Sequence, residues 1–358
     1  MIKKKINLYE TLLNKSEISQ VSKAIKSGWI SSIGANLDLF SKKFSKFSKI
    51  KYCLPVNNGT SALHLAVKAL NLKPGDKVML PNFTYIACAN VLSYEGLVPV
   101  FLDADKDTFQ IDVNDLKKKS SKQIKALMLV HLYGNVSNLT EILTICKINK
   151  IKIIEDCSEA IGSYYKKKHV GNYSIASSFS FYGNKTISTG EGGMFCTNSF
   201  RVYKRIKQIS RQGIGEINKK FDRYNHEVIG YNYRMTNICA AIGVQQMKKI
   251  KNILLVKKKI FLFYKSKLKG MPLKFIKTNF FTNNSYWLIV IKLNKKKTRD
   301  HLQLFLKKNF IETRRGFPLL SNYKMYKNYN NNEKFYNGKE LQDVTLCLPS
   351  HPKLKKKT

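Results

Sequence analysis

Acidic residues are scarce in this chain of 358 residues, which has 23 Asp and Glu against 64 Lys and Arg and a formal net charge of +41 at pH 7. The lysines are spread over the whole length and do not gather in one basic arm with interleaved aromatic side chains. Because a nucleic-acid-binding surface concentrates its charge, this distribution argues against nucleic acid as a partner. The positive surface would still attract an anionic small molecule.

Long apolar runs are also missing. No run approaches the roughly 20 residues that a membrane-spanning helix needs, and the positive N-terminal segment Met1–Ile6 is not followed by the apolar core of a signal peptide. We therefore expect a cytoplasmic protein without a membrane span. The 7 cysteines are an odd number, widely spaced and without a CxxC pair, which argues against a disulfide framework and against a metal site.

Between about Lys51 and Thr197, short apolar runs alternate with helical stretches. This alternation predicts an α/β domain with a mainly parallel central sheet and helices on both of its faces. The predicted strands are Tyr52–Val56, Lys77–Leu80, Val98–Asp103, Ile124–Leu132, Ile151–Asp156, Ser177–Phe181 and Gly193–Cys196. The predicted helices between them are Ser61–Leu70, Ile86–Tyr94, Asp112–Lys118 and Leu139–Ile148.

The C-terminal part predicts a smaller α+β domain, since the chain is long enough for two cores. Its patterns indicate a helix over Ile238–Ile253, a separate Lys-rich helix over about Lys257–Lys267, a strand over Tyr286–Leu293 and a helix over Arg299–Lys308. We expect residues 1–250 to form the large domain, with the N-terminal segment, and residues 251–358 to form the small one.

One lysine has a distinctive setting. Lys185 follows the predicted strand Ser177–Phe181 and precedes a glycine-rich turn at residues 190–193, where the backbone can approach a ligand closely. A lysine amine condenses with an aldehyde to form a Schiff base, which is how pyridoxal 5'-phosphate (PLP) is held and activated. Most lysines of this chain must be solvated, so the prediction depends on the other parts of such a site.

A candidate phosphate site lies where the first predicted helix begins. Gly59, Thr60 and Ser61 come directly after a strand. Gly59 lets the backbone come close to a ligand, and two hydroxyl groups join the free amides of the helix start, which together suit an anion. A plain Asn and Thr helix cap is the alternative interpretation of this segment.

Two further side chains follow strands. Asp156 ends an apolar strand, at the edge where open α/β sheets bind ligands, and its carboxylate could pair with the pyridine nitrogen of PLP. The alternative is an aspartate that caps the next helix. Tyr85 follows another strand and could stack on the cofactor ring, or it could be an ordinary packed aromatic residue.

These motifs, in this order, resemble the PLP-dependent nucleotide-sugar aminotransferases of the DegT type, which have the aspartate aminotransferase fold. The resemblance spans residues 25–250 and is carried by residues 29–34, 57–66, 83–90, 131–134, 154–162, 178–194 and 230–243. It implies a PLP-dependent transferase of fold type I, with a mainly parallel central sheet and a smaller C-terminal domain.

The resemblance also implies a role for each matching residue. Lys185 would form the Schiff base and carry the proton, Asp156 would pair with the pyridine nitrogen, and Glu159 would contact the ring hydroxyl where many relatives have Gln. Tyr85 would stack on the ring. The phosphate would be held by Gly59, Thr60, Ser61 and Ser180, and by Asn232 of a neighbouring subunit. Such shared sites imply a homodimer.

The implied reaction takes an amino group from L-glutamate to a 4-keto-6-deoxy sugar on GDP and leaves a 4-amino sugar for a surface polysaccharide. A UDP- or dTDP-linked keto sugar stays open as the acceptor. Two further alternatives are a PLP-dependent sugar dehydratase, in which histidine replaces the lysine that stands here at position 185, and a non-catalytic relative that binds nucleic acid.

Overall fold

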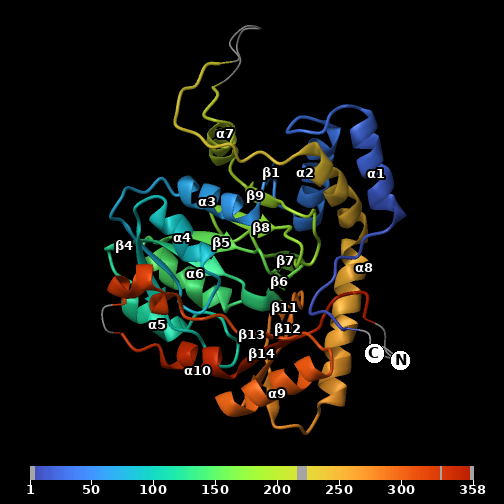
Figure 1. Cartoon of the computed structure of the whole chain (residues 1–358). Helices are drawn as coiled ribbons and strands as arrows, with labels where there is room; N and C mark the ends of the chain where they lie inside the picture. Colours follow the sequence, from blue (N-terminus) through green and yellow to red (C-terminus); the bar gives the residue numbers. More distant parts are fainter. Residues whose placement is uncertain (1–4, 216–223, 331–332, 355–358) are drawn as a thin grey trace.

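The computed structural model describes residues 5–215, 224–330 and 333–354. Two helices near the N-terminus, α1 (Lys15–Lys26) and α2 (Ala35–Ser48), pack against the first part of the long helix α8 (Asn237–Lys267). A large sheet lies beside them, and a smaller sheet lies towards the other end of α8 (Figure 1).

The large sheet has seven strands in the order β1-β9-β8-β5-β4-β2-β3. Their bounds are β1 Tyr52–Val56, β2 Lys77–Pro81, β3 Val98–Leu102, β4 Ile124–Val130, β5 Lys152–Asp156, β8 Ala176–Ser180 and β9 Gly193–Thr197. Strand β9 runs antiparallel to both of its neighbours, β1 and β8, and the remaining pairs are parallel. The predicted mainly parallel sheet is therefore confirmed, and the ends of its seven predicted strands lie within two residues of the observed ones.

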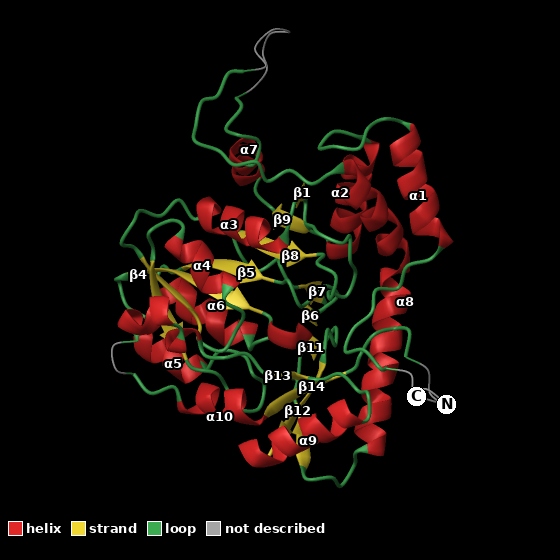
Figure 2. Cartoon of the chain, viewed as in Figure 1, coloured by secondary structure: helices red, strands yellow, loops and turns green. Residues whose placement is uncertain are grey.

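Both faces of this sheet are buried, because successive side chains of its strands point to opposite sides. In β4, Ala126 and Met128 belong to one apolar cluster, whereas Leu127 and Leu129 belong to the other. Helices α3 (Gly59–Ala69), α4 (Ala87–Ser93) and α7 (Phe200–Ile209) cover the first face, and α2, α5 (Val113–Lys119), α6 (Leu139–Ile148) and α8 cover the second (Figure 2). Helices on both faces were expected and are confirmed.

A second, antiparallel sheet has the order β10-β12-β14-β13. Its strands are β10 Leu273–Phe275, β12 Ile289–Leu293, β13 Arg314–Arg315 and β14 Thr345–Leu348, and it is accompanied by α9 (Lys296–Lys308) and α10 (Tyr336–Val344). Side chains of α8 and α9 pack on its apolar face. A small three-stranded sheet joins β11 (Thr282–Asn283) to β6 (Tyr164–Tyr165) and β7 (Lys168–His169).

Helix α8 differs from the sequence-based expectation. Two helices were predicted, ending and starting between Ile253 and Lys257, but the structure has one continuous helix of 31 residues. No proline or glycine interrupts the chain there, so nothing breaks the backbone hydrogen bonds. The predicted domain boundary after residue 250 falls inside this helix, and the division into two domains stays a prediction. None of the described helices combines the length and apolarity that crossing a membrane requires.

Candidate active site

Lys185 lies in the loop between β8 and β9, at the carboxyl end of β8. Its backbone amide donates to the carbonyl of Tyr182 in a tight turn. The side chain is largely buried, with 14% of it exposed, and its Nζ lies 3.7 Å from Oε1 of Glu159. The amine also lies 4.3 Å from the ring centroid of Trp287. The lysine is thus directed into the protein between an acid and an aromatic ring.

Asp156 ends β5, next to β8 in the sheet, and is 8% exposed. Its Oδ1 accepts hydrogen bonds from the amide of Ser158 at 3.0 Å and from the hydroxyl of Ser178 at 3.3 Å. Its Oδ2 accepts from the thiol of Cys88 at 3.5 Å. Burial, and then the nearby charge of Asp156, raise the pKa of the Cys88 thiol well above its ordinary value, which keeps the thiol protonated and able to donate.

Glu159 is the third titratable group of the site. It is 7% exposed, and its Oε2 accepts a hydrogen bond from the amide of Tyr133 at 2.8 Å. Burial raises the pKa of Glu159 to about 7, against the opposing effects of the Lys185 charge and of the Tyr133 hydrogen bond. A carboxyl group that titrates near neutrality therefore stands beside the lysine amine.

The start of α3 lies against the end of β8. Asn58 caps this helix by accepting from the amide of Ser61 at 2.8 Å, so the helix-cap alternative is correct for Asn58. A Cβ atom on Gly59 would lie 2.6 Å from the Cβ of Ser180, and both Ser61 and Ser180 are buried. Gly59, Thr60, Ser61 and Ser180 are thus brought together around a helix N-terminus, where backbone amides favour an anion.

The other two predicted site residues lie nearer the surface. Tyr85 is 58% exposed, and its ring centroid lies 6.1 Å from that of Phe317. Asn232 is exposed, and its carbonyl accepts from the side chain of Asn57, next to the start of α3. The loop that carries Asn232 is further tied to α3, because the ring of His64 hydrogen-bonds to the hydroxyl of Tyr233. The other ring nitrogen of His64 contacts Glu95 at 2.7 Å, so His64 is a packed histidine with both nitrogens satisfied.

Sequence reasoning missed three aromatic residues of the site. The ring of Tyr133 stacks between Trp287, at 6.2 Å and 12°, and Phe317, at 5.6 Å and 17°. Trp287 and Phe317 come from the C-terminal part of the chain. Tyr133 adopts a φ of 58°, a left-handed conformation that is unusual for a bulky residue and is found where function or packing imposes it. No local pattern joins residues so far apart in the sequence.

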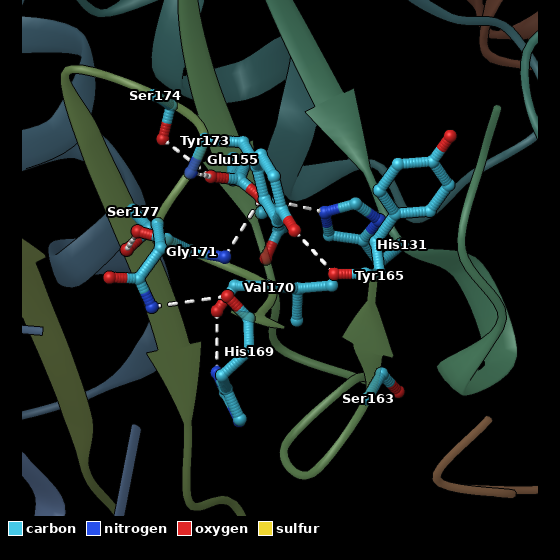
Figure 3. A network of polar contacts seen from close by, with 12 residues as sticks. His131, Glu155, Ser163, Tyr165, His169, Val170, Gly171, Tyr173, Ser174 and Ser177 are labelled. Carbon is cyan, nitrogen blue, oxygen red and sulfur yellow. Dashed lines mark hydrogen bonds and ion pairs between the residues drawn. The ribbon is translucent and has the colours of Figure 1, made fainter. Parts of the chain in front are cut away.

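A buried network beside the site fixes the end of β5 (Figure 3). Glu155 accepts hydrogen bonds from Nε2 of His131, from the amides of Gly171 and Tyr173, and from the hydroxyl of Ser174. Burial raises the pKa of Glu155, but these hydrogen bonds outweigh it, so that the net shift is downward. His131, Glu155 and Cys157 offer metal-binding atoms within 4.8 Å of one another, yet the carboxylate oxygens already serve four protein donors. We therefore interpret the trio as structural.

These features fit PLP. Because position 59 has no side chain, the start of α3 lies directly against Ser180, so that backbone amides of the helix and hydroxyl groups can face one phosphate. Asp156 and Lys185 offer the acid and the amine that would hold the ring and the aldehyde. A mainly parallel sheet with such a lysine after one strand and an aspartate after its neighbour defines the class of PLP-dependent transferases of fold type I.

The chain belongs to the DegT/DnrJ/EryC1/StrS aminotransferase family, whose model matches residues 11–358. It is 39% identical to the GDP-perosamine synthase of Vibrio cholerae over 98% of this chain and 95% of that protein. It is 38% identical to the GDP-perosamine synthase of Escherichia coli O157:H7 over 98% and 94%. Among solved structures, it resembles PseC of Helicobacter pylori, an aminotransferase of pseudoaminic acid biosynthesis, with a TM-score of 0.93, 25% identity and coverage of 99% and 96%. The protein is therefore a PLP-dependent sugar aminotransferase.

Proposed function

We propose that this enzyme transfers the amino group of L-glutamate to a GDP-linked 4-keto-6-deoxy sugar, as in the conversion of GDP-4-keto-6-deoxymannose to GDP-perosamine. The names and the nearly full-length similarity of the Vibrio cholerae and Escherichia coli relatives support the GDP sugar. The observation that carries the chemistry is the placement of Lys185 beside Glu159 and near Asp156 at one edge of the sheet.

The three titratable residues Lys185, Asp156 and Glu159 have different roles in this proposal. PLP, when bound, supplies an electron sink for the carbon that bears the amino group. The amine of Lys185 would hold the aldehyde and would carry the proton that the transfer moves. Asp156, held by Ser158, Ser178 and Cys88, would keep the pyridine nitrogen protonated. Glu159 would contact the ring hydroxyl.

The remaining residues bind and orient the cofactor. Gly59, Thr60, Ser61 and Ser180 would hold the phosphate at the start of α3, where the helix amides and dipole favour an anion. Tyr85 would stack on the ring.

We propose further that two copies share their sites in a cytoplasmic homodimer, with Asn232 reaching the phosphate in the neighbouring subunit. Exposed apolar side chains on the segment after α1 support an interface, since Trp29, Ile30 and Ile33 are 57%, 49% and 63% exposed. The 4-amino sugar would serve a surface polysaccharide such as an O-antigen.

The first test is the visible absorption spectrum of the purified protein before and after L-glutamate is added. A yellow band that bleaches with glutamate, and that the variant Lys185→Ala lacks, is the expected result. A colourless protein that PLP cannot reconstitute would overturn the proposal. Purified GDP-, UDP- and dTDP-linked 4-keto-6-deoxy sugars then each test the acceptor, because only the true one restores the yellow band of the bleached enzyme at low concentration.

A further inference from the structure

Trp287 is the one large aromatic side chain that the structure places directly on the amine of Lys185 among the described residues, at 4.3 Å from the ring centroid. It is 2% exposed and lies just before β12, in the part of the chain that forms the small sheet. Lys185 lies 102 residues earlier, at the edge of the large sheet. The contact therefore joins the two sheets at the proposed reactive group.

The same side chain also holds the backbone next to the lysine. Nε1 of Trp287 donates a hydrogen bond of 2.8 Å to the carbonyl of Asn184, the residue before Lys185. On the other side of this turn, the hydroxyl of Thr11 donates to the carbonyl of Gly183 at 3.0 Å. The turn is thus fixed at two successive carbonyls by segments from both ends of the chain.

The backbone of Trp287 is in turn anchored by the buried amine of Lys257, whose pKa burial lowers to about 7. Lys257, on α8, is 5% exposed, and its Nζ donates to the carbonyls of Trp287 at 3.0 Å, Ser350 at 2.8 Å and Tyr286 at 3.5 Å. Three carbonyl acceptors match the three protons of the ammonium group. The hydroxyl of Ser350 donates a second hydrogen bond to the Trp287 carbonyl, at 3.3 Å. The indole ring therefore has little freedom to move.

We propose that Trp287 is a positioning residue for Lys185, which sets the direction of the lysine amine through its ring face and through its hydrogen bond to Asn184. A lysine side chain has four rotatable bonds and loses about 2 kcal/mol of rotamer entropy when it is fixed. A rigid aromatic face within cation–π distance supplies a surface against which the chain is held. Lys257 acts one step further back, by holding the backbone of Trp287. The inference rests on the proposed role of Lys185.

The test compares Trp287→Leu and Trp287→Phe with the wild type, and uses Phe275→Leu as a control. Phe275 lies in β10 of the same small sheet and packs on Phe261, so its truncation removes an aromatic ring from that region without touching Lys185. We measure the visible circular dichroism of the PLP-loaded protein relative to its absorbance, and kcat and KM for L-glutamate.

We expect Trp287→Leu to lower the visible circular dichroism per unit absorbance by at least about half and to lower kcat by about 10- to 100-fold, the cost of a misplaced reacting group, with KM nearly unchanged. Trp287→Phe keeps a ring face but loses the indole N–H, so it should recover part of both signals. Lys257→Met should also lower the visible circular dichroism and kcat, but by less than Trp287→Leu. Phe275→Leu should change neither quantity.

Unchanged dichroism and kcat in Trp287→Leu, with a yellow and active wild type, would overturn the positioning role and leave the proposed function intact. Equal effects of Trp287→Leu and Phe275→Leu would also overturn it, because they would indicate a general loss of packing. A wild type that takes up no PLP would instead overturn the proposed function, and this inference with it.

Discussion

At the scale of single residues, Asp156 is the side chain whose interpretation the structure sharpens most. A plain helix cap would need only the amide of Ser158, but the carboxylate also accepts from Ser178 and Cys88, on two other elements. Donors from three directions fix both oxygens at the sheet edge, and this arrangement favours a role towards a ligand over a purely local one.

We predict that Asp156→Asn lowers kcat about 100-fold, which corresponds to roughly 3 kcal/mol of lost transition-state stabilisation. The neutral amide cannot keep the pyridine nitrogen protonated, so the ring withdraws electrons poorly. Single-turnover kinetics with L-glutamate measure the effect. Asp38→Asn, at an exposed aspartate of α2, is the control. Near-normal turnover in Asp156→Asn would leave the residue with only its capping role.

Glu159 gives a prediction for stability against pH. Its folded pKa is raised to about 7 from an ordinary value of 4.5, first by burial. Between these two values the unfolded chain ionises while the folded one stays protonated, so the free energy of unfolding falls as pH rises through this window, by up to about 3 kcal/mol. The protein without cofactor should lose this amount relative to Glu159→Gln between about pH 4.5 and about pH 7.

Urea unfolding of both proteins across this window provides the measurement. A constant difference in the free energy of unfolding between wild type and Glu159→Gln would show that the carboxyl group does not titrate there. The two pKa values bound this pH window. Below 4.5 the carboxyl group is protonated in both states, and above about 7 it is ionised in both, so the stability changes only in between.

At the scale of elements, the start of α3 depends on the absence of a side chain at position 59. A Cβ atom there would meet the Cβ of Ser180 at 2.6 Å and its Cα at 3.3 Å. Because the Ser180 backbone belongs to the central strand β8, it cannot move away cheaply. The helix therefore approaches the strand closely enough for both to reach one anion.

Gly59→Ala should cost about 1–3 kcal/mol of stability through overpacking and should weaken PLP binding as α3 shifts away from β8. Gly183→Ala is the matched control, because a Cβ atom there meets nothing within 4 Å. Thermal unfolding and titration of the apoprotein with PLP measure the two effects. Equal behaviour of both variants would contradict the close approach that we assign to Gly59.

Some helices and strands can be predicted from local sequence patterns, and others cannot. Strands such as β1 and β4 carry apolar runs between turn residues, and their positions follow from local patterns. The start of α8 was also predictable. Its continuation past Ile253 was missed, although no proline or glycine stands there to end the helix.

The residues of the candidate active site can likewise be predicted from the sequence only in part. Lys185, Asp156 and Gly59 each follow a strand or open a helix, so local sequence marks them. Trp287 and Cys88 lie in ordinary apolar stretches, and only tertiary packing brings them to Lys185 and Asp156. The raised pKa of Glu159 likewise depends on burial, which is a property of the folded chain and not of the residues around it in sequence.

At the scale of the whole molecule, the net charge of +41 should act on association and not on chemistry. A nucleotide-sugar diphosphate is an anion, and a positive field raises its rate of encounter. We predict that kcat/KM for the keto sugar falls several-fold between about 20 mM and about 300 mM ionic strength, since the Debye length shortens to below about 8 Å. The value of kcat at saturation should stay constant.

Initial rates at several salt concentrations, with a chloride and an acetate salt compared at equal ionic strength, test this effect. Agreement between the two salts would identify screening as the cause, and a flat kcat/KM would exclude steering by the charge. A gel shift with duplex DNA in the same series addresses the nucleic-acid alternative, because binding that vanishes at moderate salt and ignores sequence would be non-specific.

The continuous helix α8 has a mechanical consequence. Its 31 residues span about 46 Å at 1.5 Å per residue, and the part from Asn237, next to the loop that carries Asn232, to Lys257 spans about 30 Å. A tilt of about 0.1 radian at the Asn237 end of a stiff rod becomes a displacement of about 3 Å at Lys257. The helix therefore couples the loop that carries Asn232 to the residue that holds Trp287, so that strain at either place is felt at the other.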